Sequence, residues 1–579
     1  MTRHRIVRPL KNHGAETGAI RKNWKGKISI ALVYPNRYAV GLPNLGFQTV
    51  YGLCNSMEMV VCERMFLPDT HDTPPVSIES SRPLAQFDIV AFSISFENDY
   101  LNVPVLLKTA GIPLRSSERG DRWPMVIAGG AACIINPEPI AHFIDCFLIG
   151  EAEILLPPFM SHISSGCTRD ELLDQLARHL PGAYIPAFYE DRYTPEGNFE
   201  GLFPLKNAPQ KVPRVFSPEI DRFQTQSMVI APQSPFGNSH LIEVSRGCPH
   251  GCRFCAAGFI YRPPRFRSLS ALEPCIHAGA DVSDRIGLVG AAVSDLPDLE
   301  RLCEQARQAG VQISFSSLRA DALTPGIVAA LAASRVKTAT IAPDAGSDRM
   351  RRVINKGITE SHILEAAAAL VSAGIPNLKL YFMIGLPTET SADIDAIVIL
   401  CRKIKEVFLE RSRKTGHIGS ITVSVNAFIP KPFTPFQWAA MDRKDVLKRK
   451  LATVLHGLKS EPNMRVEANN FREAAISAVL SRGDRKISEL LEKTLKSGGN
   501  WGRTFRETPQ FRLSSYIYQE KPMDAPLPWD HIVTGISKNF LENEYKKALH
   551  GNTSPPCSMN SGCRLCGVCT QSPSPLTTS

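Results

Sequence analysis

The sequence between residues 239 and 457 alternates six times between a short apolar strand and a longer helix. The predicted strands cover residues 240–245, 285–290, 311–318, 338–343, 378–385 and 421–429. Repeated strand–helix units pair as parallel strands through right-handed crossovers, with the helices outside. Six units predict a partial (β/α)6 barrel of the TIM type, open on one side, whose chemistry lies at the carboxyl ends of its strands. We assign this barrel to residues 236–460.

A second region of alternating strands and helices precedes the barrel, at residues 27–165. The segments FDIVAFSISF, MVIAGG and CFLIG are short apolar runs, as expected of strands that are buried on both faces. They predict an α/β domain with a doubly wound, Rossmann-like parallel sheet. Gly129, Gly130 and Gly150 stand at the carboxyl ends of these strands, which is where open α/β sheets bind ligands.

The remaining segments differ in composition from the two α/β regions. Residues 1–26 form a basic tail, and the proline-rich residues 166–235 are predicted to be a connector. Residues 461–556 are predicted to be a helical C-terminal domain. Residues 557–579 combine a cysteine cluster with a Pro/Ser/Thr-rich tail that we expect to be disordered.

Composition sets broad limits on the class of protein. Apolar residues make up 43% and charged residues 21% of the chain, which is typical of a globular protein. The net charge of +10 permits a nucleic-acid partner without indicating one. Neither a signal peptide nor an apolar stretch long enough to span a bilayer is evident, so we expect a cytoplasmic protein without membrane contact. In that reducing compartment the fifteen cysteines are expected to be packing residues or metal ligands.

Three cysteines follow the first barrel strand with the spacing C-x3-C-x2-C: Cys248, Cys252 and Cys255. Thiolates suit iron–sulfur clusters or zinc. Three thiolates leave one coordination position open, whereas structural zinc takes four ligands, and His250 would strain the loop as the fourth. We therefore predict a [4Fe–4S] cluster at the mouth of the barrel, with Phe254 shielding it from solvent.

A second group of cysteines lies near the C-terminus: Cys557, Cys563, Cys566 and Cys569. Four thiolates make a closed site. Both a second [4Fe–4S] cluster and a structural zinc ion fit this ligand set, and the spacing alone does not separate them.

The cysteine loop, its aromatic residue and its place in the array resemble the radical S-adenosylmethionine (AdoMet) superfamily. The resemblance implies that the open iron binds AdoMet and that one electron cleaves a C–S bond, giving methionine and a deoxyadenosyl radical. It also implies a low-potential electron donor such as flavodoxin or ferredoxin.

Contacts to AdoMet are implied at the strand ends of the barrel. The segment LYFMIGLPTET is similar to the fifth-strand segment of the superfamily. The second strand ends in Gly290-Ala291-Ala292 where many members have Gly-Gly-Glu, which leaves the contact to the AdoMet amine unassigned. The residues expected to contact AdoMet are Phe254, Gly290, Ser317, Arg319, Asp344 and Gly385.

The N-terminal region, over residues 87–153, resembles the cobalamin-binding domain of one radical AdoMet subgroup. The implied cobalamin contacts are Ser93, Gly129, Gly130, Gly150 and Glu151. Cobalamin domains that ligate cobalt use Asp-x-His-x-x-Gly, whereas no glycine follows His71 in register here. The resemblance therefore implies cobalamin without a histidine ligand to cobalt.

Three functions follow from these features. The first is a radical AdoMet enzyme, assisted by cobalamin in methyl transfer or rearrangement of an unidentified substrate. The second is an RNA-modifying enzyme similar to the methylthiotransferases, which the basic tail favours weakly. The segment NAFIPKPFTPFQW resembles one found both in these enzymes and in cobalamin-type radical enzymes. The third is a non-catalytic iron–sulfur sensor or scaffold. No motif indicates the substrate or the catalytic residues beyond the cluster.

Overall fold

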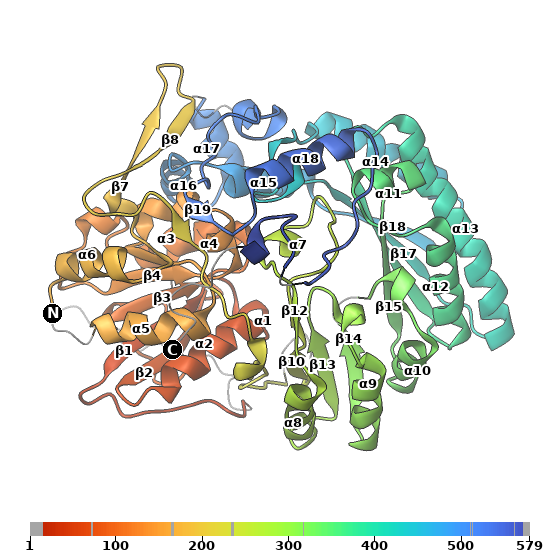
Figure 1. Ribbon diagram of the computed structural model, residues 1–579, viewed down its shortest axis with the longest axis horizontal. Coiled ribbons are helices and arrows are strands. Elements are labelled where there is room, and N and C mark those ends of the chain that lie inside the picture. The colour runs from red at the N-terminus through yellow and green to blue at the C-terminus, as the bar shows by residue number, and fades with distance from the viewer. Residues whose placement is uncertain are drawn as a thin grey trace.

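The computed structural model describes residues 16–70, 73–163, 167–232, 237–315, 318–509, 511, 513–560 and 562–570. It is an α/β structure in which two sets of parallel strands stand side by side, with a group of C-terminal helices packed across both (Figure 1). Within the described ranges, no helix combines the length and apolarity needed to cross a membrane. His71 and Ser317 lie outside these ranges.

The N-terminal half is built on one six-stranded sheet with the order β2-β1-β3-β4-β5-β6. Its strands are β1 (Ile28–Tyr34), β2 (Val60–Phe66), β3 (Ile89–Ser93), β4 (Met125–Gly129), β5 (Cys146–Leu148) and β6 (Ala183–Tyr184). The strands β1 to β5 are parallel, and β6 is antiparallel to β5. β2 and β3 lie on opposite sides of β1, so the connections from β1 to β2 and from β2 to β3 run in opposite directions along the sheet. This reversal places a crevice at the carboxyl ends of β1 and β3.

Helices cover this sheet, and they are α1 (Tyr38–Gly41), α2 (Leu45–Ser56), α3 (Asn102–Thr109), α4 (Ala131–Ile135), α5 (Ala152–Ile163) and α6 (Arg169–His179). The side chain of Asn44 caps α2 by accepting a hydrogen bond from the Phe47 amide. The described part of the basic tail, residues 16–26, packs on the same half. Its Glu16 forms a buried ion pair with Arg64 at 2.7 Å.

The predicted connector is more structured than its composition indicates. Its start, α6 and β6, belongs to the N-terminal half, because β6 extends the sheet. A hairpin follows, formed by β7 (Tyr189–Tyr193) and β8 (Phe199–Pro204). Next, β9 (Val212–Pro213) pairs with β19 (Ile532–Val533) and thereby ties the connector to the C-terminal region. Proline-rich composition predicted the turns but not these long-range pairings.

Over its described residues, the second half contains seven parallel strands in two sheets, β10-β13-β14 and β15-β16-β17-β18. Their bounds are β10 (His240–Glu243), β13 (Arg285–Val289), β14 (Gln312–Phe315), β15 (Thr338–Asp344), β16 (Asn377–Ile384), β17 (Ile421–Ala427) and β18 (Met464–Ala468). A short antiparallel pair, β11 (Ser245–Arg246) and β12 (Arg265–Phe266), follows β10. The strand β18 lies within residues 461–556, which the sequence predicts to be a helical domain. It is a partly exposed, polar edge strand, so it lacks the apolar run that marks the others.

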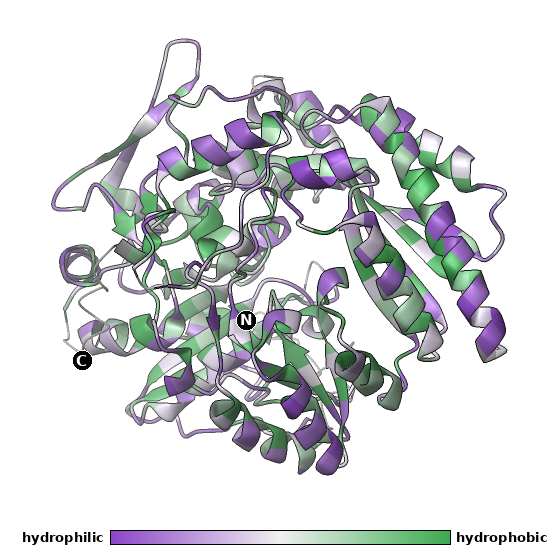
Figure 2. Ribbon diagram, turned by 45° about the vertical axis from the view of Figure 1, so that its right-hand side comes forward, coloured by the Kyte–Doolittle hydropathy of each residue, from purple (hydrophilic) through white to green (hydrophobic). Residues whose placement is uncertain are grey.

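The helices of this half are α7 (Ala257–Ile260), α8 (Leu269–Ala280), α9 (Leu299–Gln308), α10 (Pro325–Ala333), α11 (Asp348–Val353), α12 (Glu360–Ser372), α13 (Ser391–Thr415) and α14 (Lys444–Leu458). Ser268 and Thr324 cap α8 and α10 with their side chains. Figure 2 shows apolar strands and apolar inner helix faces, with polar residues on the outer faces of helices such as α13.

The C-terminal helices join the two halves. They are α15 (Phe471–Arg482), α16 (Ile487–Lys496), α17 (Trp501–Glu507) and α18 (Lys538–Leu549). The loop between α15 and α16 reaches the N-terminal half, where the Asn136 side chain donates a hydrogen bond to the Gly483 carbonyl at 2.7 Å. Glu138, which is fully buried, pairs with Arg485 at 2.9 Å. The Asn136-Pro-Glu138 segment therefore holds the halves together.

Replacing Arg485 with methionine is expected to lower the free energy of unfolding by about 3 kcal/mol, because the buried Glu138 carboxylate loses its charge partner. The Arg485 guanidinium also donates to the Tyr184 hydroxyl at 2.7 Å and to the Tyr189 carbonyl at 2.8 Å. Urea unfolding at equilibrium measures the change. Arg503→Met is the matched control, because its ion pair with Glu507 is exposed and is expected to contribute less than about 1 kcal/mol. Equal losses in both variants would contradict this account.

Candidate functional site

A cavity of about 410 Å³ lies between the two halves of the molecule. One wall is formed by the carboxyl ends of the N-terminal strands, including Ala91 and Ile127. The opposite wall comes from the start of the cysteine loop at Gly247, from Ala257 on α7, and from Ala291 after β13. The crevice of the first sheet therefore faces the strand ends of the second.

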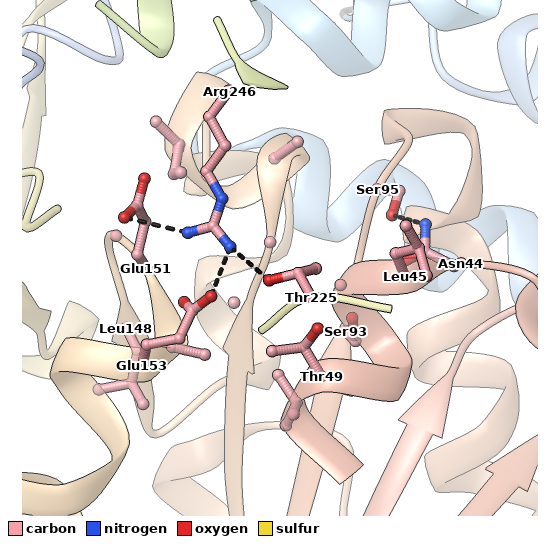
Figure 3. A pocket seen from close by; sticks show the side chains of 18 of the residues that line it. Asn44, Leu45, Thr49, Ser93, Ser95, Leu148, Glu151, Glu153, Thr225 and Arg246 are labelled. Carbon is pink, nitrogen blue, oxygen red and sulfur yellow. Dashed lines mark hydrogen bonds and ion pairs between the residues drawn. The ribbon is translucent and has the colours of Figure 1, made fainter. Parts of the chain in front are cut away.

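The cavity gathers residues that are distant in the sequence. Ser93, Gly129, Gly130, Gly150 and Glu151, expected at one ligand site, all line it. Most of its surface is apolar, and Figure 3 shows the polar side chains of Asn44, Thr49, Ser95 and Thr225 around it. The Asn44 amide donates to the Ser95 hydroxyl at 3.0 Å.

Two hydroxyls in this lining have no hydrogen-bond partner among the described residues: Thr49 Oγ1 and Ser245 Oγ. Both atoms are buried from solvent. Leaving a buried polar atom unpaired costs about 1–3 kcal/mol. The two hydroxyls are therefore suited to a bound molecule that brings its own hydrogen-bonding groups.

Two of the cavity glycines are required by the backbone itself. Gly130 has φ +105°, and a Cβ there would lie 2.5 Å from the Ile94 carbonyl oxygen. Gly150 has φ +151°, and a Cβ would lie 2.2 Å from the Val215 carbonyl oxygen. Close packing of chain on chain explains both glycines without a ligand. Their place in the cavity, not their identity as glycine, makes them candidate contacts.

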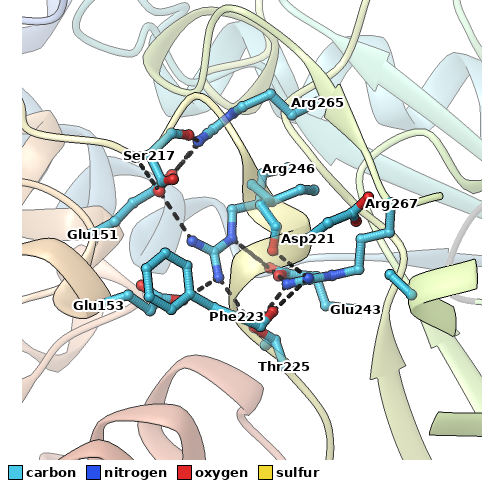
Figure 4. A network of polar contacts seen from close by, with 12 residues as sticks. Glu151, Glu153, Ser217, Asp221, Phe223, Thr225, Glu243, Arg246, Arg265 and Arg267 are labelled. Atoms are coloured by element: carbon cyan, nitrogen blue, oxygen red, sulfur yellow. Dashed lines mark hydrogen bonds and ion pairs between the residues drawn. The ribbon is translucent and has the colours of Figure 1, made fainter. Parts of the chain in front are cut away.

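Glu151 is not a free carboxylate, because it belongs to a network of ion pairs centred on Arg246 (Figure 4). Arg246 pairs with Glu151 at 3.1 Å, with Glu243 at 3.0 Å, and with Glu153. Glu151 also pairs with Arg265 at 2.7 Å. Burial alone would raise the pKa of Glu151, but the neighbouring guanidiniums outweigh it and the pKa is lowered.

This network connects the N-terminal half to the cysteine loop. Glu151 and Glu153 stand at the start of α5, whereas Arg246 directly precedes Gly247 and Cys248. Arg267 completes the network by pairing with Glu243 at 2.7 Å. The sequence analysis did not identify Arg246 or Arg267, because an arginine carries no sequence signal for its ion-pair partner.

The cysteine loop lies between β11 and α7, at the carboxyl end of β10. It is held by backbone hydrogen bonds, from Cys255 N to Cys252 O and from Arg253 N to Ile354 O, both at 3.0 Å. Burial raises the pKa of the Cys248 thiol to about 12, with smaller effects from Cys252 and Cys255. A cationic metal centre would favour the thiolate form of these cysteines.

Charged groups surround this loop. Lys356, after α11, pairs with Asp344 at 2.5 Å, and both act on the pKa of Cys252, which burial raises and Lys356 lowers. Arg319 also lowers it, and donates to the Lys356 carbonyl at 3.1 Å. The structure therefore brings Arg319 and Asp344 to the loop. The sequence analysis missed Lys356, because it lies in a short turn without any recognisable pattern.

Three further residues were predicted to contact AdoMet: Gly385, Gly290 and Phe254. Gly385 has φ +84°, donates its amide to Glu389 at 2.7 Å, and faces Leu447 on α14. A Cβ at Gly290 would lie 2.4 Å from the Ser245 hydroxyl oxygen, so this residue packs closely on the strand pair at the loop. Phe254 is partly buried against the core.

His250 does not approach the thiols as a fourth ligand would, since its Nε2 atom interacts with Asp295 Oδ1 at 2.7 Å. Among the described residues, no group of three or more His, Cys, Asp or Glu side chains is already arranged around a single metal ion. Cys557, the first of the C-terminal cysteines, lies against the loop, because its amide donates to the Pro249 carbonyl at 2.7 Å.

Two family models match the chain. The model described as "Radical SAM proteins, N-terminal" matches residues 46–186, and "Radical SAM superfamily" matches residues 242–401. The first range contains most of the N-terminal half, and the second contains the cysteine loop and most of the strands that follow it.

Among curated proteins, the uncharacterized protein MJ0966 of Methanocaldococcus jannaschii is 31% identical over 468 residues, covering 80% of this chain and 90% of that protein. The threonylcarbamoyladenosine tRNA methylthiotransferase MtaB of Treponema pallidum is 25% identical over 228 residues, covering 37% of this chain and 46% of that enzyme.

Among solved structures, the radical AdoMet methyltransferase TsrM of Kitasatospora setae, with cobalamin and a [4Fe–4S] cluster bound, has a TM-score of 0.46 at 14% identity, over 71% of this chain and 74% of that one. The cobalamin-dependent radical enzyme OxsB has a TM-score of 0.44 at 12% identity, over 91% and 84%. The family models and the match to MJ0966 decide the classification. They confirm the prediction made from the cysteine loop: the chain belongs to the radical SAM superfamily, and to the same family within it as MJ0966.

Proposed function

We propose that Cys248, Cys252 and Cys255 hold the [4Fe–4S] cluster of a radical AdoMet enzyme. One observation carries the proposal: the three cysteines stand in a glycine-containing loop at the carboxyl end of the first strand of a parallel array. A cluster with one open iron supplies the electron that cleaves bound AdoMet. The protein's own part is to hold three thiolates and leave the fourth position accessible.

The charged residues around the loop have separable roles in this proposal. Lys356 and Arg319 supply positive charge next to Cys252, which offsets the negative charge of thiolate ligands. Asp344 holds the Lys356 ammonium in place through their 2.5 Å ion pair. Asp295 fixes the His250 ring, so that this histidine stays out of the ligand set. Gly290, Ser317, Gly385 and Phe254 remain predicted contacts to AdoMet.

We further propose that the cavity between the two halves binds cobalamin. Its position supports this, because a molecule bound there would lie between the N-terminal strand ends and the cysteine loop. Its chemistry also fits, since the mostly apolar walls suit a corrin ring and the unpaired hydroxyls of Thr49 and Ser245 suit its side-chain amides. Methyl transfer to carbon, or rearrangement, of an unidentified substrate is then the expected reaction class.

The test of the radical chemistry is deoxyadenosine formation. Protein reconstituted anaerobically with iron and sulfide, then reduced in the presence of AdoMet, is expected to produce deoxyadenosine detectable by mass spectrometry. A protein that carries its cluster and still forms none would refute the enzymatic proposal and favour an iron–sulfur sensor. Addition of bulk RNA provides a further arm: acceleration by RNA alone would favour the RNA-modifying alternative.

Cobalamin binding is tested separately from the cluster. Protein purified after growth with cobalamin is expected to contain about one cobalt per chain and to show corrin absorption. Ser93→Phe, which places a bulky ring at the end of β3 in the cavity, is expected to lower cobalt at least about tenfold while leaving iron unchanged. Ser270→Phe, on the exposed start of α8, is the control. Background cobalt in the wild-type protein would exclude the proposal.

A further inference from the structure

The segment after α18 passes directly over the cysteine loop. The Cys557 amide donates to Pro249, which lies between the first two cysteines of the loop, at 2.7 Å. The Ser554 amide donates to the Asn355 side chain at 2.9 Å, and Asn355 in turn donates to the Gly251 carbonyl at 3.2 Å. The C-terminal segment is therefore attached to the loop at two points.

A buried arginine adds a third attachment. Arg253, within the cysteine loop, is fully buried and pairs with Glu544 of α18 at 3.0 Å. Its guanidinium also donates to the Asn552 carbonyl at 2.8 Å and to the Val353 carbonyl at 2.9 Å. The ion pair and the hydrogen bonds to backbone carbonyls thus fix the cysteine loop relative to the turn after α11 and to the C-terminal segment.

The four C-terminal cysteines lie within one stretch of thirteen residues, 557–569, of this segment. Cys566 is buried, and its carbonyl accepts a hydrogen bond from the Ser537 amide at 2.9 Å. The backbone thereby fixes one side of the group, while Cys557, Cys563 and Cys569 remain partly exposed.

The spacing favours iron over zinc. Cys563, Cys566 and Cys569 follow the pattern C-x2-C-x2-C, which is the run that binds [4Fe–4S] clusters in bacterial ferredoxins. Structural zinc sites use pairs of ligands separated by a longer segment. Here Cys557 precedes the run by only a few residues, so the four ligands form one continuous group.

We propose that Cys557, Cys563, Cys566 and Cys569 bind a second [4Fe–4S] cluster, with all four irons ligated by protein, docked on the loop that carries the first. Since the ligand set is closed, this cluster has no open iron for AdoMet. The Cys557 amide is hydrogen-bonded to the carbonyl of Pro249, the residue after Cys248. We therefore expect the two clusters to be neighbours and their electron spins to interact. The second site itself is independent of the AdoMet chemistry proposed above, whereas the spin interaction rests on the loop cluster.

The experiment measures metal content and electron paramagnetic resonance on the full chain, reconstituted anaerobically. The wild-type protein is expected to hold about eight iron and eight sulfide atoms per chain, and Cys563→Ala/Cys566→Ala about four. The triple variant Cys248→Ala/Cys252→Ala/Cys255→Ala is also expected to retain about four, now at the C-terminal site. Cys303→Ala, a buried cysteine of α9, is the matched control and should retain the wild-type content.

The reduced wild-type protein is expected to give a spectrum broadened by spin–spin interaction, and each cluster variant a simple one. About four iron atoms with about one zinc per chain in the wild-type protein would overturn the proposal, as would an iron-free triple variant. The iron and zinc content of the wild-type protein tests the second-cluster proposal even where a variant fails to fold. Loss of deoxyadenosine formation with eight irons present would instead refute only the proposed function.

Discussion

Replacing Cys255 with alanine is expected to abolish deoxyadenosine formation from AdoMet, with no product above background. Cys255 lies in the loop, where its backbone amide donates a hydrogen bond to the Cys252 carbonyl. Removing one of three thiolates leaves two open positions on a cluster that needs three protein ligands, so the cluster is lost or converted. Mass spectrometry of the product, together with the absorption of the cluster, measures the effect.

Cys303→Ala controls for the loss of a cysteine as such. This residue is buried on α9, away from both cysteine groups in the sequence, and burial raises the pKa of its thiol to about 12, so it is an inert packing residue. Its variant should form deoxyadenosine at the wild-type rate. Turnover by Cys255→Ala at that rate would show that the loop is not the site of AdoMet cleavage.

Replacing Arg246 with methionine is expected to lower the free energy of unfolding by about 5 kcal/mol at pH 7, the upper end of the cost of breaking a buried ion pair. Arg246 pairs with the carboxylates of Glu151, Glu153 and Glu243. In the variant, Glu151 still pairs with Arg265 and Glu243 still pairs with Arg267. Glu153 would remain buried with an uncompensated charge. Because Arg246 directly precedes the cysteine loop, iron content is expected to fall as well.

The loss should depend on pH. The pKa of Glu151 is lowered in the folded state, so this group contributes stability above its unfolded-state pKa and loses it as the pH falls through the folded-state value. Protonation in acid neutralises the carboxylates that pair with Arg246, and the variant's deficit should shrink as the pH falls below the ordinary glutamate pKa of 4.5. Urea unfolding at about pH 7 and about pH 3 measures the change. Arg301→Met, at an exposed pair on α9, should change stability by less than about 1 kcal/mol, and a pH-independent deficit for Arg246→Met would count against the network.

The sequence predicted the features that depend on local pattern. Buried strands such as β3 and β16 are recognisable as apolar runs, and the cysteine loop is recognisable by spacing. The prediction also placed Gly129 and Gly130 at strand ends, and strand ends of one sheet necessarily meet at one edge. The family followed from the same loop, because three thiolates at that position constrain the chemistry more than any other segment does.

The features that sequence analysis missed depend on contacts between distant residues. Arg246 and Lys356 acquire their roles only when the fold brings carboxylates or thiols to them. Thr49 became a candidate because its hydroxyl is unpaired in the folded chain, which no spacing reveals. The edge strand β18 lies in a region predicted to be helical, because its alternation of apolar and polar residues covers only five residues and is too short to stand out beside the helices that follow.

The contact between Cys557 and Pro249 has a consequence for biosynthesis. Arg253 in the loop and its partner Glu544 are separated by 291 residues, so the loop leaves the ribosome long before the segment that covers it. During that interval the loop proposed to hold the first cluster is not yet covered by the segment around Glu544. The contacts that cover the loop can therefore form only after the intervening chain has been made.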